Sequence, residues 1–212
     1  VFEGPLKVGS NARKAGEDVV EGEVLLPAGR RVTPGDVGLF SATGAGTVSV
    51  YKPLKVAVMS TGDELVQPGE KASSAQIYDA NRPMLLAALK KLGHEAIDLG
   101  CLADDRALIK DAMERGAALA DVILTSGGAS AGDEDHISAL LNETDTMALW
   151  RVAMKPGRPM ALGVWNGTPI FGLPGNPVAA LVCTLVFAAP AMNLLSGQDW
   201  AIPEGVMVPA NF

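Results

Sequence analysis

The chain has 212 residues, of which 48% are hydrophobic and 19% are charged, and this balance favours a compact globular protein over a disordered one. Its formal net charge of -7 argues against a nucleic-acid-binding protein, because such proteins concentrate Lys and Arg on one face. The two cysteines, Cys101 and Cys183, show no metal-ligand spacing, so we interpret them as buried, reduced thiols of a cytoplasmic protein.

The first fifty residues are rich in glycine, and short apolar runs such as residues 24–26 and 48–50 lie between the glycines. Frequent turns between short runs predict strands of a small β-rich module. Lys52 and Pro53 end this module, because proline interrupts a strand ladder. We therefore predict a β-rich linker or partial domain at residues 1–53.

The rest of the chain alternates between predicted strands and helices. Residues 55–59 form a short apolar strand. A helix then begins with Asn81 as its cap and Pro83 in its first turn, and Gly93 ends it. Residues 96–99 form the second strand.

The same alternation continues in the middle of the chain. Asp104 or Asp105 can cap a second helix, which runs to about Ala120. A third strand follows at residues 121–125, and a shorter helix begins near residue 136.

Further strand-like runs precede the last helix, at residues 150–154, 160–164 and 168–171. Asn176 caps the last helix and Pro177 opens it. Its apolar stretch, residues 178–195, is interrupted by polar residues and a proline, so we predict a buried helix and no membrane span. The alternation as a whole predicts a three-layer α/β domain with a largely parallel sheet at residues 54–198.

The chain ends suggest a longer protein. Val1 is not a natural initiator residue, and we expect residues 199–212 to be the start of a truncated C-terminal β-domain.

Ligands of open parallel sheets bind beyond the carboxyl ends of the strands, and loops of small residues lie at those ends. They are residues 60–64, 126–135 and 172–177. Free backbone N–H groups in such loops can receive an oxyanion. Each loop alone is also a common turn, but together they predict an anion-binding pocket at one edge of the sheet.

Two cations and several carboxylates accompany these loops. Lys155 and Arg158 lie in a proline-stiffened loop, which lowers the entropy lost when both hold an anion; the alternative is a pair of solvated surface charges. The carboxylates are Asp63, Glu64, Asp104, Asp105, Asp133 and Asp135. Helix capping explains some of them; the others indicate a divalent cation, for which oxygen ligands suit Mg²⁺.

The chain resembles the molybdopterin molybdenumtransferases, and also the C-terminal catalytic domain of gephyrin. The resemblance covers nearly the whole chain, with motifs in the family's order at residues 60–65, 77–81, 104–105, 126–135, 155–159 and 172–177. Arg158 stands where lysine is common in the family, and a guanidinium binds oxyanions at least as well.

The resemblance implies a reaction. Adenylylated molybdopterin and molybdate bind, the pyrophosphate link is cleaved, AMP leaves, and molybdenum is placed on the dithiolene sulfurs. It also implies Mg²⁺, a homodimer, small-molecule substrates and a molybdopterin adenylyltransferase as a partner, without nucleic acid or membrane.

The resemblance also implies roles for residues. Glu64, Asp105 and Asp135 match acidic residues that the family places around the metal and the pterin phosphate, so they are the candidate catalytic and metal-binding residues. The candidate binding residues are Thr61, Gly62, Asp63, Ser126, Gly127, Gly128, Ser130, Lys155, Arg158, Pro174, Gly175 and Asn176.

Two other functions stay open. A molybdopterin adenylyltransferase shares the α/β domain and the Ser-Gly-Gly loop, and a non-catalytic scaffold could keep the fold for protein binding. In the family dimer the N-terminal part supplies residues to the partner's cleft, so we expect this stretch alone to bind cofactor and to turn over poorly or not at all.

Overall fold

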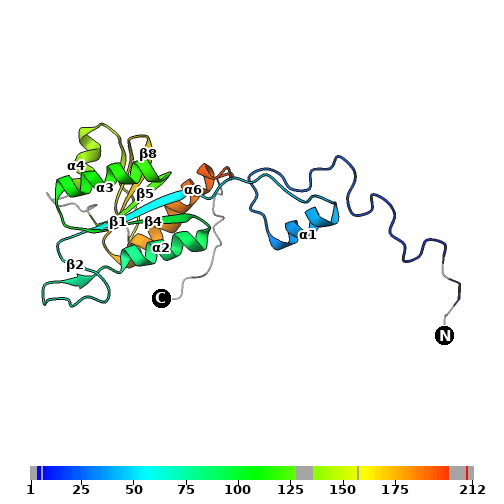
Figure 1. The fold of residues 1–212 in the computed structure, drawn as a ribbon, viewed down its shortest axis with the longest axis horizontal. Coiled ribbons are helices and arrows are strands. Elements are labelled where there is room, and N and C mark those ends of the chain that lie inside the picture. The colour runs from blue at the N-terminus through cyan, green and yellow to red at the C-terminus, as the bar shows by residue number, and fades with distance from the viewer. Residues whose placement is uncertain (1–3, 6, 128–135, 157, 201–208, 210–212) are drawn as a thin grey trace. The chain divides into compact units, whose positions relative to one another are not determined.

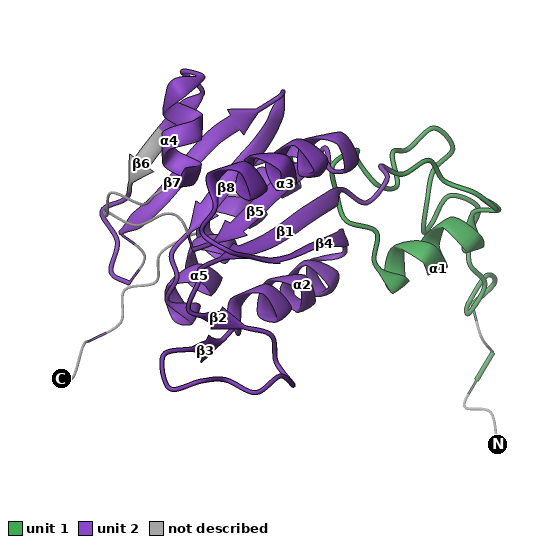
Figure 2. Cartoon of the chain, turned by 60° about the vertical axis from the view of Figure 1, so that its left-hand side comes forward, with its two compact units in different colours: residues 1–50 green, residues 51–212 purple. Residues whose placement is uncertain are grey.

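The computed structural model of the chain divides into two compact units, residues 1–50 and residues 51–212, which Figure 2 colours separately. The residues that it describes are 4, 5, 7–127, 136–156, 158–200 and 209. The sequence placed the boundary between the units at residues 53 and 54.

The first unit contains the helix α1, Pro34–Ala42. A reciprocal capping box begins it, because the Thr33 N–H donates to Oδ2 of Asp36 at 2.8 Å and the Asp36 N–H donates to the Thr33 hydroxyl. The Thr33 hydrogen bonds lower the pKa of Asp36. Within the described part of this unit no strand forms, unlike the predicted short strands. Residues 46–50 are exposed and make no ladder, and an extended segment becomes a strand only when a neighbour pairs with its N–H and C=O groups.

The second unit is built on a six-stranded sheet with the order β4-β1-β5-β8-β7-β6. Its strands are β1 (Lys55–Thr61), β4 (Glu95–Leu102), β5 (Val122–Ser126), β6 (Met147–Arg151), β7 (Pro159–Trp165) and β8 (Thr168–Leu173). β4, β1, β5 and β8 run parallel, whereas β7 is antiparallel to both of its neighbours. The predicted α/β fold with a largely parallel sheet is confirmed.

Helices cover both faces of this sheet (Figures 1 and 2). They are α2 (Asn81–Leu92) and the C-terminal helix on one face, and α3 (Arg106–Leu119) and α4 (His136–Glu143) on the other. Alternate side chains of β1 point to opposite faces, so Val56 and Val58 pack with Leu85 of α2. Ala57 and Met59 pack on the opposite side, in the core that α3 and α4 cover. The result is the predicted three-layer domain.

The C-terminal helix runs through three segments, α5 (Pro177–Cys183), the π-helical η1 (Thr184–Ala188) and α6 (Ala189–Leu195). The wider π turn precedes Pro190, which has no N–H to donate. By length and composition alone this helix could cross a membrane. Ala180, Cys183 and Met192 nevertheless lie in the core between the sheet and α2, the position of a core helix.

Helix starts follow the predicted caps in two of three places. Asp105 and Asn176 cap α3 and α5 through their side chains. The prediction that Asn81 caps α2 was wrong, because Ala80 is the N-cap and Asn81 is already helical. The Asn81 side chain instead donates hydrogen bonds to Ser126 and Gly175. Gly93 ends α2 in the left-handed conformation, with φ of 92°.

A second, two-stranded sheet was not predicted. β2 (Leu65–Val66) and β3 (Ile77–Tyr78) pair in parallel. In the order of the chain they come after β1 and before α2. The predicted strand at residues 150–154 lies slightly earlier, in β6, and Val152 instead donates its N–H to the Arg158 carbonyl across the next turn at 3.0 Å. Most of the predicted C-terminal β-domain, at 201–208 and 210–212, lies outside the described residues, so it stays a prediction.

Candidate active site

The carboxyl ends of three parallel strands lie side by side in register. Ser60 at the end of β1 pairs with Ser126 at the end of β5, and Ser126 pairs with Leu173 at the end of β8. The loops that follow these strands therefore begin at the same edge of the sheet. This edge is where α/β proteins bind ligands.

A cavity of about 100 Å³ opens between these loops. Its lining consists of Thr61, Glu64, Leu65, Ile77, Tyr78, Asp79, Ala80, Asn81, Ser126, Gly127, Gly175 and Pro177. Thr61, Ser126 and Gly175 come from the loops that the sequence singled out, and the structure brings them together here. A wider hollow lies against residues 9–17, but these residues are one exposed stretch of chain, so we do not consider it a site.

Gly127 packs directly against the end of β1. A Cβ atom at this position would lie 2.3 Å from the carbonyl oxygen of Thr61, and φ of Gly127 is +86°. Only glycine combines a left-handed backbone with so close an approach. The loop after β5 is thereby held against the loop after β1.

Asn81 joins the other side of the cavity. Its Nδ2 donates to the Ser126 Oγ and to the Gly175 carbonyl, each at 2.7 Å. The residue is only 8% exposed. The first residue of α2 therefore ties the end of β5 to the loop after β8.

A buried network supports the floor of the site. The Ser60 hydroxyl donates to Oδ2 of Asp79 at 2.5 Å, and the Arg82 Nε donates to the same oxygen at 2.9 Å. Arg82 also pairs with Asp98 and donates to Oε1 of Gln67 at 2.8 Å. Burial works against the charge of Arg82, but its hydrogen bonds with Asp98 and Asp79 outweigh burial and raise its pKa.

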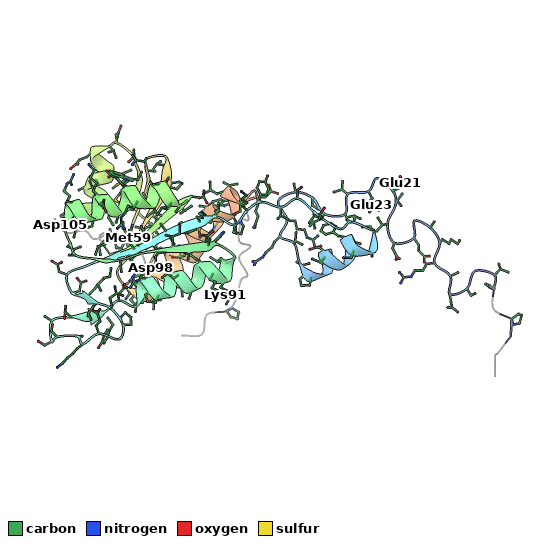
Figure 3. The ribbon with its side chains drawn as sticks, viewed as in Figure 1. Glu21, Glu23, Met59, Lys91, Asp98 and Asp105 are labelled. Atoms are coloured by element: carbon green, nitrogen blue, oxygen red, sulfur yellow. The ribbon has the colours of Figure 1, made fainter. Side chains whose placement is uncertain are left out.

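The candidate carboxylates take different positions. Glu64 is exposed and lines the cavity, whereas Asp63 turns away and accepts the backbone N–H of Asp104 at 3.0 Å. Asp105 lies at the start of α3 (Figure 3), where its Oδ1 accepts the N–H groups of Ala107 and Leu108 at 2.8 and 2.9 Å. Within the described ranges no three His, Cys, Asp or Glu side chains gather closely enough to hold a metal.

The candidate cations lie at the same edge but outside the cavity. Ala161 of β7 pairs with Gly172 of β8, so the start of β7 and the end of β8 share one edge, and the loop with Lys155 and Arg158 precedes β7. Both side chains are exposed, and neither lines the cavity. β8 and β7 lie between this loop and β5, which explains the separation.

Several candidates cannot be placed or serve a local role. Gly128, Ser130 and Asp135 lie outside the described residues. Asn176 uses its Oδ1 to accept the Ala179 N–H at 3.1 Å, and Pro174 is buried. Of the third loop, Gly175 and Pro177 line the cavity.

The comparisons with known proteins agree with this geometry. Residues 57–193, which include the whole edge described above, match the family described as "Probable molybdopterin binding domain". The chain belongs to the molybdopterin-binding domain family. Residues 2–44 match a second family, described as the MoeA N-terminal region (domain I and II).

Individual proteins that are similar to this chain have names from molybdopterin biosynthesis. The molybdopterin molybdenumtransferase of Haemophilus influenzae is 42% identical over 93% of this chain and 49% of its own length. A molybdopterin biosynthesis MoeA protein from Pyrococcus horikoshii superposes with a TM-score of 0.76 at 35% identity, over 86% of this chain and 46% of its own. The chain thus spans about half the length of the curated relatives it matches.

A more distant likeness concerns the fold alone. The tungsten cofactor synthesizing protein MoaB from Pyrococcus furiosus has a TM-score of 0.50 at 16% identity, over 70% of this chain and 99% of its own. MoaB-like proteins therefore share the α/β core of the molybdopterin-binding domain.

The sequence missed part of the cavity wall of this domain. Asn81 was interpreted as a helix cap, and no role was assigned to Asp79 or Arg82. The only signal was that residues 77–81 form one of the motifs of the family. Nothing in their local sequence shows that these polar side chains turn inward.

Proposed function

We propose that the protein containing this chain inserts molybdenum into molybdopterin. In this reaction molybdate and adenylylated molybdopterin bind, the pyrophosphate link is cleaved, and AMP leaves. The observation that carries the proposal is the convergence of Thr61, Ser126 and Gly175 at one cavity, at the ligand-binding edge of a molybdopterin-binding domain.

The phosphate of the pterin is assigned to the loop after β5. Ser126 and Gly127 supply a hydroxyl and a backbone N–H at the cavity, and Gly128 and Ser130 belong to the same loop. Preorganised donors of this kind stabilise an oxyanion because they need no rearrangement when it binds. Thr61 at the end of β1 and Gly175 in the loop after β8 line the cavity beside this loop.

Molybdate needs countercharge, which the cavity lining does not supply among the described residues. Lys155 and Arg158 are two exposed cations in one loop at this edge of the sheet, so we assign molybdate to their side of the site. Both side chains are long, and neither takes part in an ion pair that the structure describes. They can therefore reach an anion at the mouth of the cavity.

We assign Mg²⁺ to carboxylates that follow the strands at this edge of the sheet. Glu64 is an exposed carboxylate at the cavity, and Asp105 caps α3 through Oδ1 alone among the hydrogen bonds described; Asp135 is the third ligand in our assignment. Carboxylate oxygens are the ligands that Mg²⁺ prefers. When bound, the ion would neutralise charge on the phosphates during cleavage.

The family and the thiols support a proposal for the assembly and the location. We propose a cytoplasmic homodimer that receives its substrate from a molybdopterin adenylyltransferase. Cys101 and Cys183 are not joined by a disulfide bond, which fits a reducing compartment.

The reaction is tested by measuring AMP release. Full-length protein is incubated with adenylylated molybdopterin and Mg²⁺, with and without molybdate, and AMP is quantified by chromatography. Molybdate-dependent release of AMP supports insertion. Formation of adenylylated pterin from ATP would instead identify an adenylyltransferase.

A non-catalytic scaffold is the remaining alternative. Asp105→Ala and Asp135→Ala separate it from the enzyme, because both remove proposed metal ligands. Unchanged AMP release by both full-length variants would favour the scaffold and contradict our assignment.

A further inference from the structure

Asn81 makes contacts that its place in a helix does not require. It is the first residue of α2, and the helix has no side-chain cap. Both of its described side-chain hydrogen bonds instead go to distant residues, Ser126 and Gly175, which lie 45 and 94 positions away in the chain. Asn81 therefore serves the cavity, and its role in α2 itself is minor.

The chemistry of these contacts fixes their direction. The Gly175 carbonyl can only accept a hydrogen bond, so the atom beside it is the amide nitrogen of Asn81. That nitrogen carries a second N–H group, which it donates to the Ser126 Oγ. The distance between Nδ2 and Oγ is 2.7 Å. Ser126 is therefore the acceptor in this bond, and its own O–H stays available as a donor.

The donor is placed at the cavity. Ser126 is 2% exposed and lines the cavity next to Gly127. Bulk water therefore has little access to its hydroxyl, and a molecule in the cavity can accept its hydrogen bond. A hydroxyl whose lone pair is occupied by Asn81 is oriented before a ligand arrives. Such orientation lowers the entropy lost on binding an anion.

The second polar atom of Asn81 shows that the two donated hydrogen bonds determine how this side chain is oriented. Its Oδ1 is buried and has no hydrogen-bond partner among the described residues, although buried polar atoms are nearly always paired. Asn81 itself lines the cavity. The side chain therefore keeps its Nδ2 on Ser126 and Gly175 even though its Oδ1 gains no described partner.

We propose that Asn81 is a positioning residue for the pterin phosphate. It holds Ser126 as a hydrogen-bond donor toward the cavity and ties the Gly175 loop to the end of β5. This inference rests on the proposed function, since the phosphate is that of molybdopterin.

A double-mutant cycle on molybdopterin binding tests it. Asn81→Leu has nearly the same volume but no donor, and Ser126→Ala removes the hydroxyl. In the full-length protein we expect Asn81→Leu to weaken binding roughly 10- to 100-fold when Ser126 is present. In the Ser126→Ala background the loss should be smaller by about 5-fold or more, because no hydroxyl remains to be oriented.

The controls separate a local effect from a general one. Asn142→Leu makes the same chemical change on the exposed surface of α4 and should leave the dissociation constant unchanged. If Asn81→Leu does not fold, Asn81→Ala replaces it in the cycle. Equal losses in both Ser126 backgrounds would overturn the proposal.

A ligand-free measurement keeps the inference distinct from the proposed function. In amide hydrogen exchange of the free protein, Asn81→Leu should increase exchange at residues 126–127 and 175–176 but not within residues 122–124. If molybdopterin does not bind to the wild-type protein, the proposed function fails while this measurement still decides the role of Asn81. Unchanged exchange in both loops would overturn it.

Discussion

Gly127 and Thr61 lie in such close contact that no side chain fits between them. A Cβ on Gly127 would lie 2.3 Å from the Thr61 carbonyl oxygen and 3.2 Å from its Oγ1. Thr61 ends β1 and Gly127 follows β5, its neighbour in the sheet, so this contact joins two walls of the cavity. Backbone atoms form it, and they cannot move aside as a flexible side chain can.

Gly127→Ala should therefore destabilise the protein. The new methyl group meets a backbone oxygen, and the positive φ is unfavourable for alanine, so we expect a loss of about 2 kcal/mol or more in the free energy of unfolding. Urea denaturation measures it. Gly175→Ala is the matched control, because a Cβ there has nothing within 4 Å and should change stability little. Equal losses for the two variants would contradict the described contact.

The pair of Arg82 and Asp79 should contribute more to stability than the exposed ion pairs. Their side chains are 7% and 1% exposed, and removal of one partner leaves a buried charge alone. Arg82→Met should lower the free energy of unfolding by about 3 to 5 kcal/mol. Chemical denaturation of the purified variant measures this loss.

Arg106 provides the matched control for Arg82. It pairs with Glu143, and their side chains are 43% and 58% exposed, so water screens the interaction. Arg106→Met should cost less than about 1 kcal/mol. If the two methionine variants lost the same free energy of unfolding, the prediction that the buried Arg82 pair stabilises the protein more than the exposed pair would be wrong.

Asp105 has two proposed roles that substitutions can separate. Asparagine caps a helix about as well as aspartate, so Asp105→Asn should keep the thermal stability, whereas Asp105→Ala should lose about 1 kcal/mol. Both remove the carboxylate that we assign to Mg²⁺. Asp105→Asn should therefore raise the Mg²⁺ concentration needed for half-maximal AMP release roughly 10-fold. An unchanged Mg²⁺ requirement would leave Asp105 as a helix cap alone.

Thiol labelling should depend strongly on pH. Burial raises the pKa of both Cys101 and Cys183 above its ordinary value, so both thiols are neutral and slow to react at pH 7. Because the folded state keeps these protons longer than the unfolded state, stability should also fall as the pH rises beyond the pKa of unfolded cysteine. Intact mass after iodoacetamide treatment measures the labelling.

The two cysteines should differ in this experiment. Cys101 is partly exposed and Cys183 is buried, so Cys101 should react first as the pH rises. Both should react at once in urea, which controls for the reagent. Rapid labelling of Cys183 in the native protein at pH 7 would be inconsistent with its burial.

Local features of the sequence were predicted from local chemistry. Asp105 and Asn176 cap their helices, and Gly93 ends α2, because each effect depends on residues within a few positions. The position of β1 followed in the same way from a short apolar run. The strand ends then located the loops of the site through a general property of parallel sheets.

Contacts between distant segments could not be predicted. The amide of Asn81 reaches Ser126 and Gly175, and only the folded sheet brings these residues together. The separation of Lys155 from the cavity depends on the strand order. This order puts β8 and β7 between β5 and the loop that contains Lys155. The strands expected before residue 50 have no strand partner in the part of the chain that the structure describes, and such pairing depends on distant segments that local sequence does not specify.

A crystal structure of the full-length protein with molybdopterin tests the central claim most directly. We predict that the pterin phosphate lies within hydrogen-bond distance of the Ser126 hydroxyl and the Gly127 N–H. Density for the phosphate at another edge of the sheet, with the cavity between Thr61, Ser126 and Gly175 empty, would contradict the proposed site.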